Sequence, residues 1–160
     1  MVDVEQGSLN YFLSRPVDGR WAGILKALAE ELTAQMPAGE IRGFFAVLGR
    51  RWARSMPLPP LTDLKSFETA ANAALGAADW GWVRVRDLGS SVELQHSCAP
   101  LRSAFGAEAL AWAAGLLEGL YAEWLREQGA EAGLVLRQVG QAEGPADTLR
   151  FRLATADYFA

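Results

Sequence analysis

The sequence has only one cysteine, Cys98, and one histidine, His96, among its 160 residues. One cysteine excludes a disulfide within the chain, and it excludes zinc sites built from four cysteines or from two cysteines and two histidines. Basic clusters are also missing, and the net charge is -4. We therefore expect no metal, no cofactor, and neither nucleic acid nor an anionic membrane surface as the main partner.

Long hydrophobic runs are absent too. No stretch approaches the roughly 20 apolar residues that a membrane-spanning helix needs. The N-terminus carries Asp3 and Glu5 where a secretory signal would carry lysine or arginine. These features predict a cytoplasmic protein without a membrane span, with the periplasm as the alternative compartment.

Groups of residues that could carry out catalysis are equally scarce. His96 and Cys98 are two residues apart, but no carboxylate stands beside them to orient the histidine as a base. His96 is in register with Val92 and Leu94 on the inward side of a predicted strand, which favours a hydrogen-bonded histidine with a structural role. Carboxylate pairs on the predicted helices are typical of a solvated surface, and no glycine-rich phosphate loop follows a strand. The sequence therefore predicts a protein that is not an enzyme.

Apolar residues recur at helical spacing in three segments that follow the N-terminus. The predicted helices cover residues 21–36, 41–56 and 64–76. Thr62 or Asp63 is expected to cap the third helix by accepting hydrogen bonds from its first free amides. Residues 1–20 are expected to form a weakly structured lead, and residues 21–160 a single domain.

Beyond Trp80 the apolar residues alternate with polar ones, which is typical of β-strands with one face in water. Val83 and Val85 would point inward, while Arg84 and Arg86 would point outward. The predicted strands cover residues 80–87, 92–96, 134–139 and 148–153, and residues 140–145 are expected to be a loop. They form two hairpins that are separated by a further helix.

This further helix, residues 106–128, is apolar over about half of its circumference. Such a helix either lies centrally in its own domain or shares one side with another copy of the chain. The predicted fold class is α+β, with three N-terminal helices, a β-hairpin, a long central helix and a C-terminal β-hairpin, the helices being packed on a small antiparallel sheet. The candidates for contacts between copies are the large apolar side chains of the central helix: Trp112, Leu116, Leu120, Tyr121 and Trp124.

Three short segments of the chain are distinctive. They are LEGLY at residues 117–121 followed by Trp124, WGWV at residues 80–83, and PPL at residues 59–61. In this order and spacing they resemble the bacterial family of cellulose synthase operon protein D, and the resemblance covers most of the chain. Trp82 stands where the family would have tyrosine, an exchange that keeps an aromatic ring but removes its hydroxyl.

The resemblance implies a noncatalytic accessory subunit of bacterial cellulose synthesis. Members of this family are similar in forming dimers that assemble into a ring-like octamer, whose inner passages would guide glucan chains for export and crystallisation. The implied partners are further copies of the chain, other subunits of the cellulose synthase complex, and β-1,4-glucan. Polymerisation from UDP-glucose would belong to the other subunits.

The N-terminal lead is the segment that we expect to lie closest to a glucan path. Gln6 and Asn10 offer hydrogen bonds there, and Tyr11 offers one ring for stacking. One alternative hypothesis is a cytoplasmic scaffold that arranges cellulose synthase complexes by binding proteins and never contacts glucan. Another is a hydrolase or thiol enzyme that uses His96 and Cys98.

Overall fold

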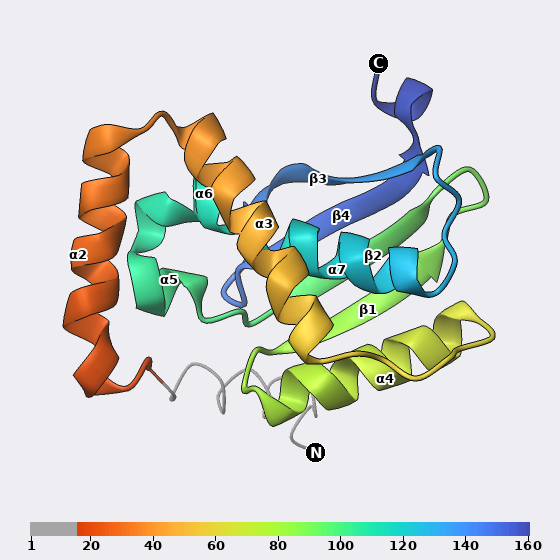
Figure 1. Cartoon of the computed structure of the whole chain (residues 1–160), viewed down its shortest axis with the longest axis horizontal. Coiled ribbons are helices and arrows are strands. Elements are labelled where there is room, and N and C mark those ends of the chain that lie inside the picture. The colour runs from red at the N-terminus through yellow and green to blue at the C-terminus, as the bar shows by residue number, and fades with distance from the viewer. Residues whose placement is uncertain (1–15) are drawn as a thin grey trace.

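A computed structural model describes residues 16–160, and its helices and strands are labelled in Figure 1. In chain order they are α2 (Gly19–Gln35), α3 (Ala38–Ser55), α4 (Leu64–Ala77), β1 (Trp82–Asp87), β2 (Val92–Ser97), α5 (Leu101–Phe105), η1 (Ala107–Ala109), α6 (Leu110–Ala113), α7 (Gly115–Glu127), β3 (Leu134–Glu143), β4 (Thr148–Thr155) and η2 (Ala156–Phe159). The predicted α+β fold class is confirmed.

The four strands form one antiparallel sheet in the order β1-β2-β4-β3. Each hairpin contributes two strands, and the hairpins join through β2 and β4, where Leu94 lies opposite Phe151. Alternate side chains point to one face of the sheet, and that face supplies the buried residues Val83, Leu94, Leu149 and Phe151. The two predicted hairpins therefore share one core.

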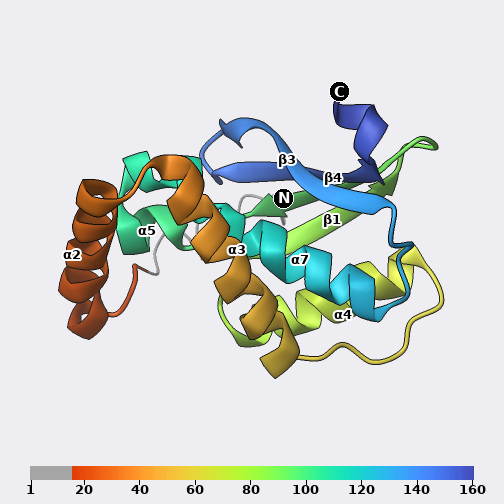
Figure 2. The ribbon, with the colours of Figure 1, turned by 45° about the horizontal axis from the view of Figure 1, so that its top comes forward.

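Helices are stacked in layers on this inner face. Helix α7 lies across the sheet, α3 crosses over α7, and α4 runs beside β1 (Figures 1 and 2). Because α7 is covered by the sheet on one side and by α3 on the other, its side chains Leu117, Leu120, Tyr121 and Trp124 are fully buried. The broad apolar surface expected of the central helix is thus explained by two contacts within one chain.

The crossing of α3 over α7 depends on glycine. A Cβ atom added to Gly49 of α3 would lie closer than 3.0 Å to the carbonyl oxygen of Leu116, and one added to Gly119 of α7 would lie equally close to that of Ala46. Gly115 meets the backbone of Arg42 in the same way. Real Cβ atoms do not approach backbone oxygens so closely, so the two helix backbones can touch only where side chains are missing.

Polar contacts hold the far end of the same crossing. The buried carboxylate of Glu123 accepts hydrogen bonds from Arg54 Nε of α3 and from Arg126 Nη2, both at 2.8 Å. The indole N–H of Trp124 donates to the carbonyl oxygen of Met56, which directly follows α3, at 3.0 Å. These bonds fix the end of α3 against α7.

Side chains from the helices also occupy both edges of the sheet. At the β1 edge, Asn72 accepts from the Val83 N–H at 2.7 Å and donates to the Val83 carbonyl at 2.9 Å, as a neighbouring strand would. The Glu68 carboxylate accepts from the Val85 N–H at 2.7 Å. At the β3 edge, the Glu118 carboxylate accepts from the Gln138 N–H at 2.9 Å. Backbone groups that would otherwise be open to another chain are satisfied within the fold.

The segment before α7 differs from its prediction. Residues 101–105 form α5, for which the sequence analysis found no signal, and the central helix begins as the 3-10 turn η1. The hydrogen-bond pattern is interrupted at Ala114, where α6 ends and where Gly115 first meets α3. The loop predicted at residues 140–145 is wrong in its first part, because strand β3 continues to Glu143, with an irregular register after Val139. The Asp63 cap is confirmed as a capping box with Ser66.

The glycine crossing predicts that Gly119→Ala will destabilise the protein. The added methyl group must displace a helix backbone, so we expect the free energy of unfolding to fall by about 3 kcal/mol, in the upper range for overpacked cores. Urea denaturation followed by circular dichroism would measure the change. The matched control is Gly76→Ala in α4, where nothing lies within 4 Å of the added atom. That variant should be as stable as the original or slightly more so; equal losses in both would contradict the crossing as the cause.

Glu123 predicts a dependence of stability on pH. Arg126 and Arg54 lower the pKa of Glu123 from 4.5 to about 2 in the folded protein. A group with a lowered pKa stabilises the fold above its unfolded value, and this contribution is lost as the pH falls from 4.5 to about 2. Glu123→Gln should lower the free energy of unfolding at neutral pH by about 1.5–3 kcal/mol and flatten its pH dependence in that window. Glu127→Gln, at an exposed position of α7, is the control and should change neither quantity.

Candidate functional site

The side chains predicted to join copies of the chain lie mostly in the core. Trp112 is 5% exposed, while Leu120, Tyr121 and Trp124 are completely buried. Leu116 is partly buried against the same core. A second copy could reach the four buried side chains only if the chain opened. The geometry therefore favours a different surface for contacts between copies.

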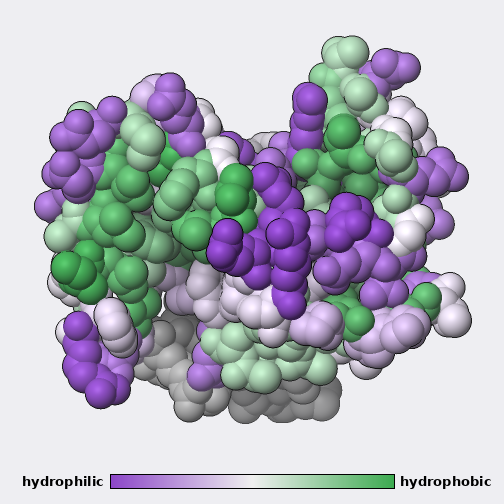
Figure 3. All heavy atoms as spheres, viewed as in Figure 1, coloured by the Kyte–Doolittle hydropathy of each residue, from purple (hydrophilic) through white to green (hydrophobic). Residues whose placement is uncertain are grey.

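A large exposed apolar surface lies on α2 and α3. On α2, Trp21 and Ile24 are both 61% exposed, and the green area in Figure 3 spreads from this helix onto α3. Only Ala29 is buried among the 17 residues of α2. We call this surface the α2–α3 face and define it by the large apolar side chains that water reaches: Trp21, Ile24, Leu28, Phe44, Val47 and Leu48.

The α2–α3 face exists because the apolar residues of α3 divide between two sides of the helix. Ile41 and Phe45 point inward, where the Phe45 ring packs against Trp112 with centroids 4.9 Å apart. Phe44 and Leu48 belong to the same helix but are exposed. On α3, the small residues of the crossing lie on the side that faces α7. The large apolar side chains Phe44, Val47 and Leu48 therefore lie on the outer side of the helix.

His96 has a structural role, as predicted. Its Nε2 donates to the Trp80 carbonyl oxygen at 2.8 Å, and its Nδ1 forms a short hydrogen bond with the Tyr121 hydroxyl. Complete burial lowers the pKa of His96 to about 4, so the ring is neutral at pH 7. Burial and the charge of Asp147 raise the pKa of Cys98 to about 11. With both ring nitrogens engaged and the thiol protonated, these residues do not form a nucleophile and base.

The three distinctive segments of the sequence also stabilise the fold. WGWV supplies the Trp80 carbonyl that binds His96, and LEGLY supplies Gly119 at the crossing. PPL is held by Gln128, whose side chain donates to the Pro59 carbonyl at 3.1 Å and accepts from the Leu61 N–H at 2.9 Å. None of these segments forms part of the α2–α3 face.

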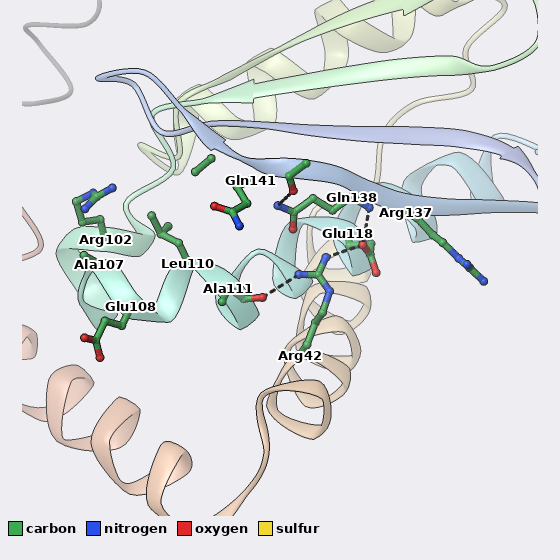
Figure 4. A pocket seen from close by; sticks show the side chains of 12 residues that line it. Arg42, Arg102, Ala107, Glu108, Leu110, Ala111, Glu118, Arg137, Gln138 and Gln141 are labelled. Carbon is green, nitrogen blue, oxygen red and sulfur yellow. Dashed lines mark hydrogen bonds and ion pairs between the residues drawn. The ribbon is translucent and has the colours of Figure 1, made fainter. Parts of the chain in front are cut away.

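A polar groove lies between the β3 edge and the helices α3 and α6 (Figure 4). It encloses about 730 Å³. Gln138 and Gln141 line one wall, and Leu110 lies opposite them (Figure 4). We call it the β3 groove; the side chains and backbone of Arg42, Arg102, Ala107, Glu108, Leu110, Ala111, Glu118, Arg137, Gln138, Gly140, Gln141 and Ala142 line it. No pattern in the sequence predicts this groove, since it forms where β3 departs from regular pairing.

Gln6, Asn10 and Tyr11 lie outside the described residues, so their place near a glucan path stays a prediction. Among residues 16–160, no three histidine, cysteine or carboxylate side chains come together as metal ligands would. Over the same range, every helix is too short or too polar to cross a bilayer.

Comparison with known proteins gives a consistent match. The family model for the cellulose synthase D-subunit matches residues 7–152. A protein named cellulose synthase operon protein D from Komagataeibacter xylinus is 28% identical over 138 residues, which are 82% of this chain and 88% of that protein. The protein of the same name from Komagataeibacter sucrofermentans has the same identity and coverage. The match spans the layered helices, the whole of β1 and β2 and most of the C-terminal hairpin, and the chain belongs to the cellulose synthase D-subunit family.

Proposed function

We propose that this protein is a noncatalytic accessory subunit of bacterial cellulose synthesis, which assembles with copies of itself into a ring-like oligomer and organises glucan chains for export and crystallisation. Family membership places it in cellulose biosynthesis. The observation that carries the assembly is the α2–α3 face. Most of the stability of a helix in a protein comes from packing of its apolar side, and α2 gains little burial from its own chain.

Contact with a second copy would bury the α2–α3 face. Each side chain of this face is between 37% and 61% exposed. Covering it would contribute about 1 kcal/mol for each half-exposed apolar side chain. Large exposed apolar patches of this kind are typical of protein interfaces rather than of isolated monomers.

The ends of the α2–α3 face favour pairing with another copy. On α2, Ile24 and Leu28 are followed on the same side of the helix by Glu31. On α3, Phe44 is followed in the same way by Arg51. Opposite charges thus lie at the two ends of the face, which favours an arrangement in which two copies bring unlike charges together. A self-complementary surface of this kind produces a closed dimer, the unit from which a ring can be built.

Light scattering at micromolar concentration tests the assembly. We expect the full chain to form oligomers, and Ile24→Asp to weaken the contact about 10- to 100-fold because a charge replaces a buried apolar side chain. The control is Ala73→Asp, which adds the same charge at an exposed position of α4. A monomeric full chain, or equal dissociation in both variants, would count against the proposal. Circular dichroism would confirm that each variant is folded.

Cellulose made by cells that carry Ile24→Asp tests the role in crystallisation. The crystalline fraction of the cellulose should fall by X-ray diffraction, while glucose incorporation falls less, because polymerisation is assigned to other subunits. The same cells with Ala73→Asp should produce normal fibres. Full crystallinity together with lost assembly would favour a protein that has no part in ordering glucan.

A further inference from the structure

We propose that the outer face of the sheet binds an extended, acidic segment of a partner protein. The proposal rests on the function proposed above, since an accessory subunit acts through partners, and it names the chemistry of one of them. Helices α3 and α7 lie on the inner side of the sheet (Figures 1 and 2). We call the other side the arginine face and define it by five side chains from three strands: Arg84, Arg86, Arg137, Arg150 and Arg152.

Alternation along the strands turns these side chains outward. Successive side chains of a strand point to opposite faces of a sheet, and the inner face holds the buried Val83 of β1 and Phe151 of β4. Arg84 follows Val83, and Arg150 and Arg152 flank Phe151, so all three point outward. The sequence shows no basic cluster because the strands that carry the arginines are far apart in the chain.

The register of the strands places the arginines in two rows across the sheet. The first row, from β1 to β4, is Arg84, Gln95 and Arg150; the second row, from β1 to β3, is Arg86, Glu93, Arg152 and Arg137. Residues two apart in a strand are about 7 Å apart, and strands β1 and β4, with β2 between them, are about 10 Å apart. The positive charges therefore form a flat and regular array.

Positive charge on the arginine face exceeds negative charge. The strands place two carboxylates there: Glu93 accepts from Arg152 Nη2 at 3.2 Å, and Glu143 forms an ion pair with Arg150. Five guanidinium groups thus face two carboxylates, on a chain whose net charge is -4. The face has the opposite sign to the protein as a whole, and it is complementary to an acidic ligand.

Two of the arginines repel each other. Arg137 of β3 lies directly opposite Arg152 of β4, and like charges at opposite positions destabilise a sheet. Arg86 and Arg137 form no ion pair with a carboxylate of residues 16–160, although Arg137 lies 5.4 Å from the centre of the Phe159 ring. Carboxylates brought by a ligand would remove this repulsion. The pairing of like charges is the observation that favours an acidic partner.

An extended peptide fits the spacing of the array. Its side chains at positions i and i+2 lie on one side about 7 Å apart, as Arg84 and Arg86 do on β1. Each carboxylate can accept two parallel hydrogen bonds from a guanidinium group. A nucleic acid carries charge at every unit, so Glu93 in the middle of the second row would repel it. A peptide can place an uncharged residue at that position.

Fluorescence anisotropy with a labelled peptide of alternating glutamate and threonine tests the proposal. We expect the full chain to bind it saturably at low ionic strength and more weakly at physiological ionic strength, because salt screens exposed charges. Arg86→Gln and Arg137→Gln should each weaken binding about threefold, and the two together about tenfold. Lys26→Gln removes the same charge at an exposed position of α2, and this control should bind as the unsubstituted chain does.

Further ligands test the kind of partner. A peptide of the same composition with its glutamates in one block should bind more weakly, and equal binding would overturn the extended fit. Tighter binding of a single-stranded oligonucleotide of equal charge would overturn the choice of a peptide. Binding that appears only in a chain with Asp3→Asn and Glu5→Gln would assign the face to the N-terminal residues of the chain itself, and the proposal of a partner protein would be wrong.

Light scattering on the same samples separates this proposal from the assembly. The oligomer should be the same in every variant because the arginine face and the α2–α3 face share no residue, and circular dichroism would confirm that each variant is folded. Absence of peptide binding with the oligomer intact, or equal binding by all variants, would overturn the arginine face and leave the assembly standing. A monomeric unsubstituted chain that binds the peptide would instead contradict the assembly and support the arginine face.

Discussion

The close approach of α3 to α7 is the contact on which the rest of the structure depends. Gly49, Gly115 and Gly119 allow two helix backbones to touch, and this contact holds α7 against the sheet. Because only small groups fit at the crossing, the bulky apolar residues of α3 must lie elsewhere on the helix. Some reach the core beside Trp112, and the others face outward next to α2. The same crossing therefore explains both the stable interior and the apolar exterior.

The segments that carry the resemblance to the family and the surface that we propose for assembly are different parts of the chain. The distinctive segments supply a glycine at the helix crossing, a carbonyl for His96 and a backbone turn held by Gln128. Each is constrained by close packing or by buried hydrogen bonds, in which few residue types can substitute. The α2–α3 face, in contrast, depends only on apolar character, which several residue types can supply.

The elements of the fold could largely be predicted from the sequence, because hydrophobic periodicity shows directly which residues form helices and strands. Alternation at Val83 and Val85 identified β1, and Asp63 identified the start of α4. Periodicity shows which side of a helix is apolar but not what covers it. The apolar sides of α2 and α7 looked alike in this respect, yet α7 is enclosed by its own chain whereas α2 is largely exposed. The deciding feature was the glycine spacing in α7, whose meaning depends on a partner helix about 70 residues away in the chain.

The occupied edges of the sheet affect how copies of this protein can join. Asn72 and Glu68 fill one edge, and Glu118 blocks the other at Gln138. Strand pairing between molecules can continue indefinitely, because each added strand exposes a new edge. Two helix faces that pair about a twofold axis bury each other and leave no free face for a third copy. With these edge positions occupied, open-ended growth by strand pairing is obstructed, so the assembly proposed above should reach a definite size and stop.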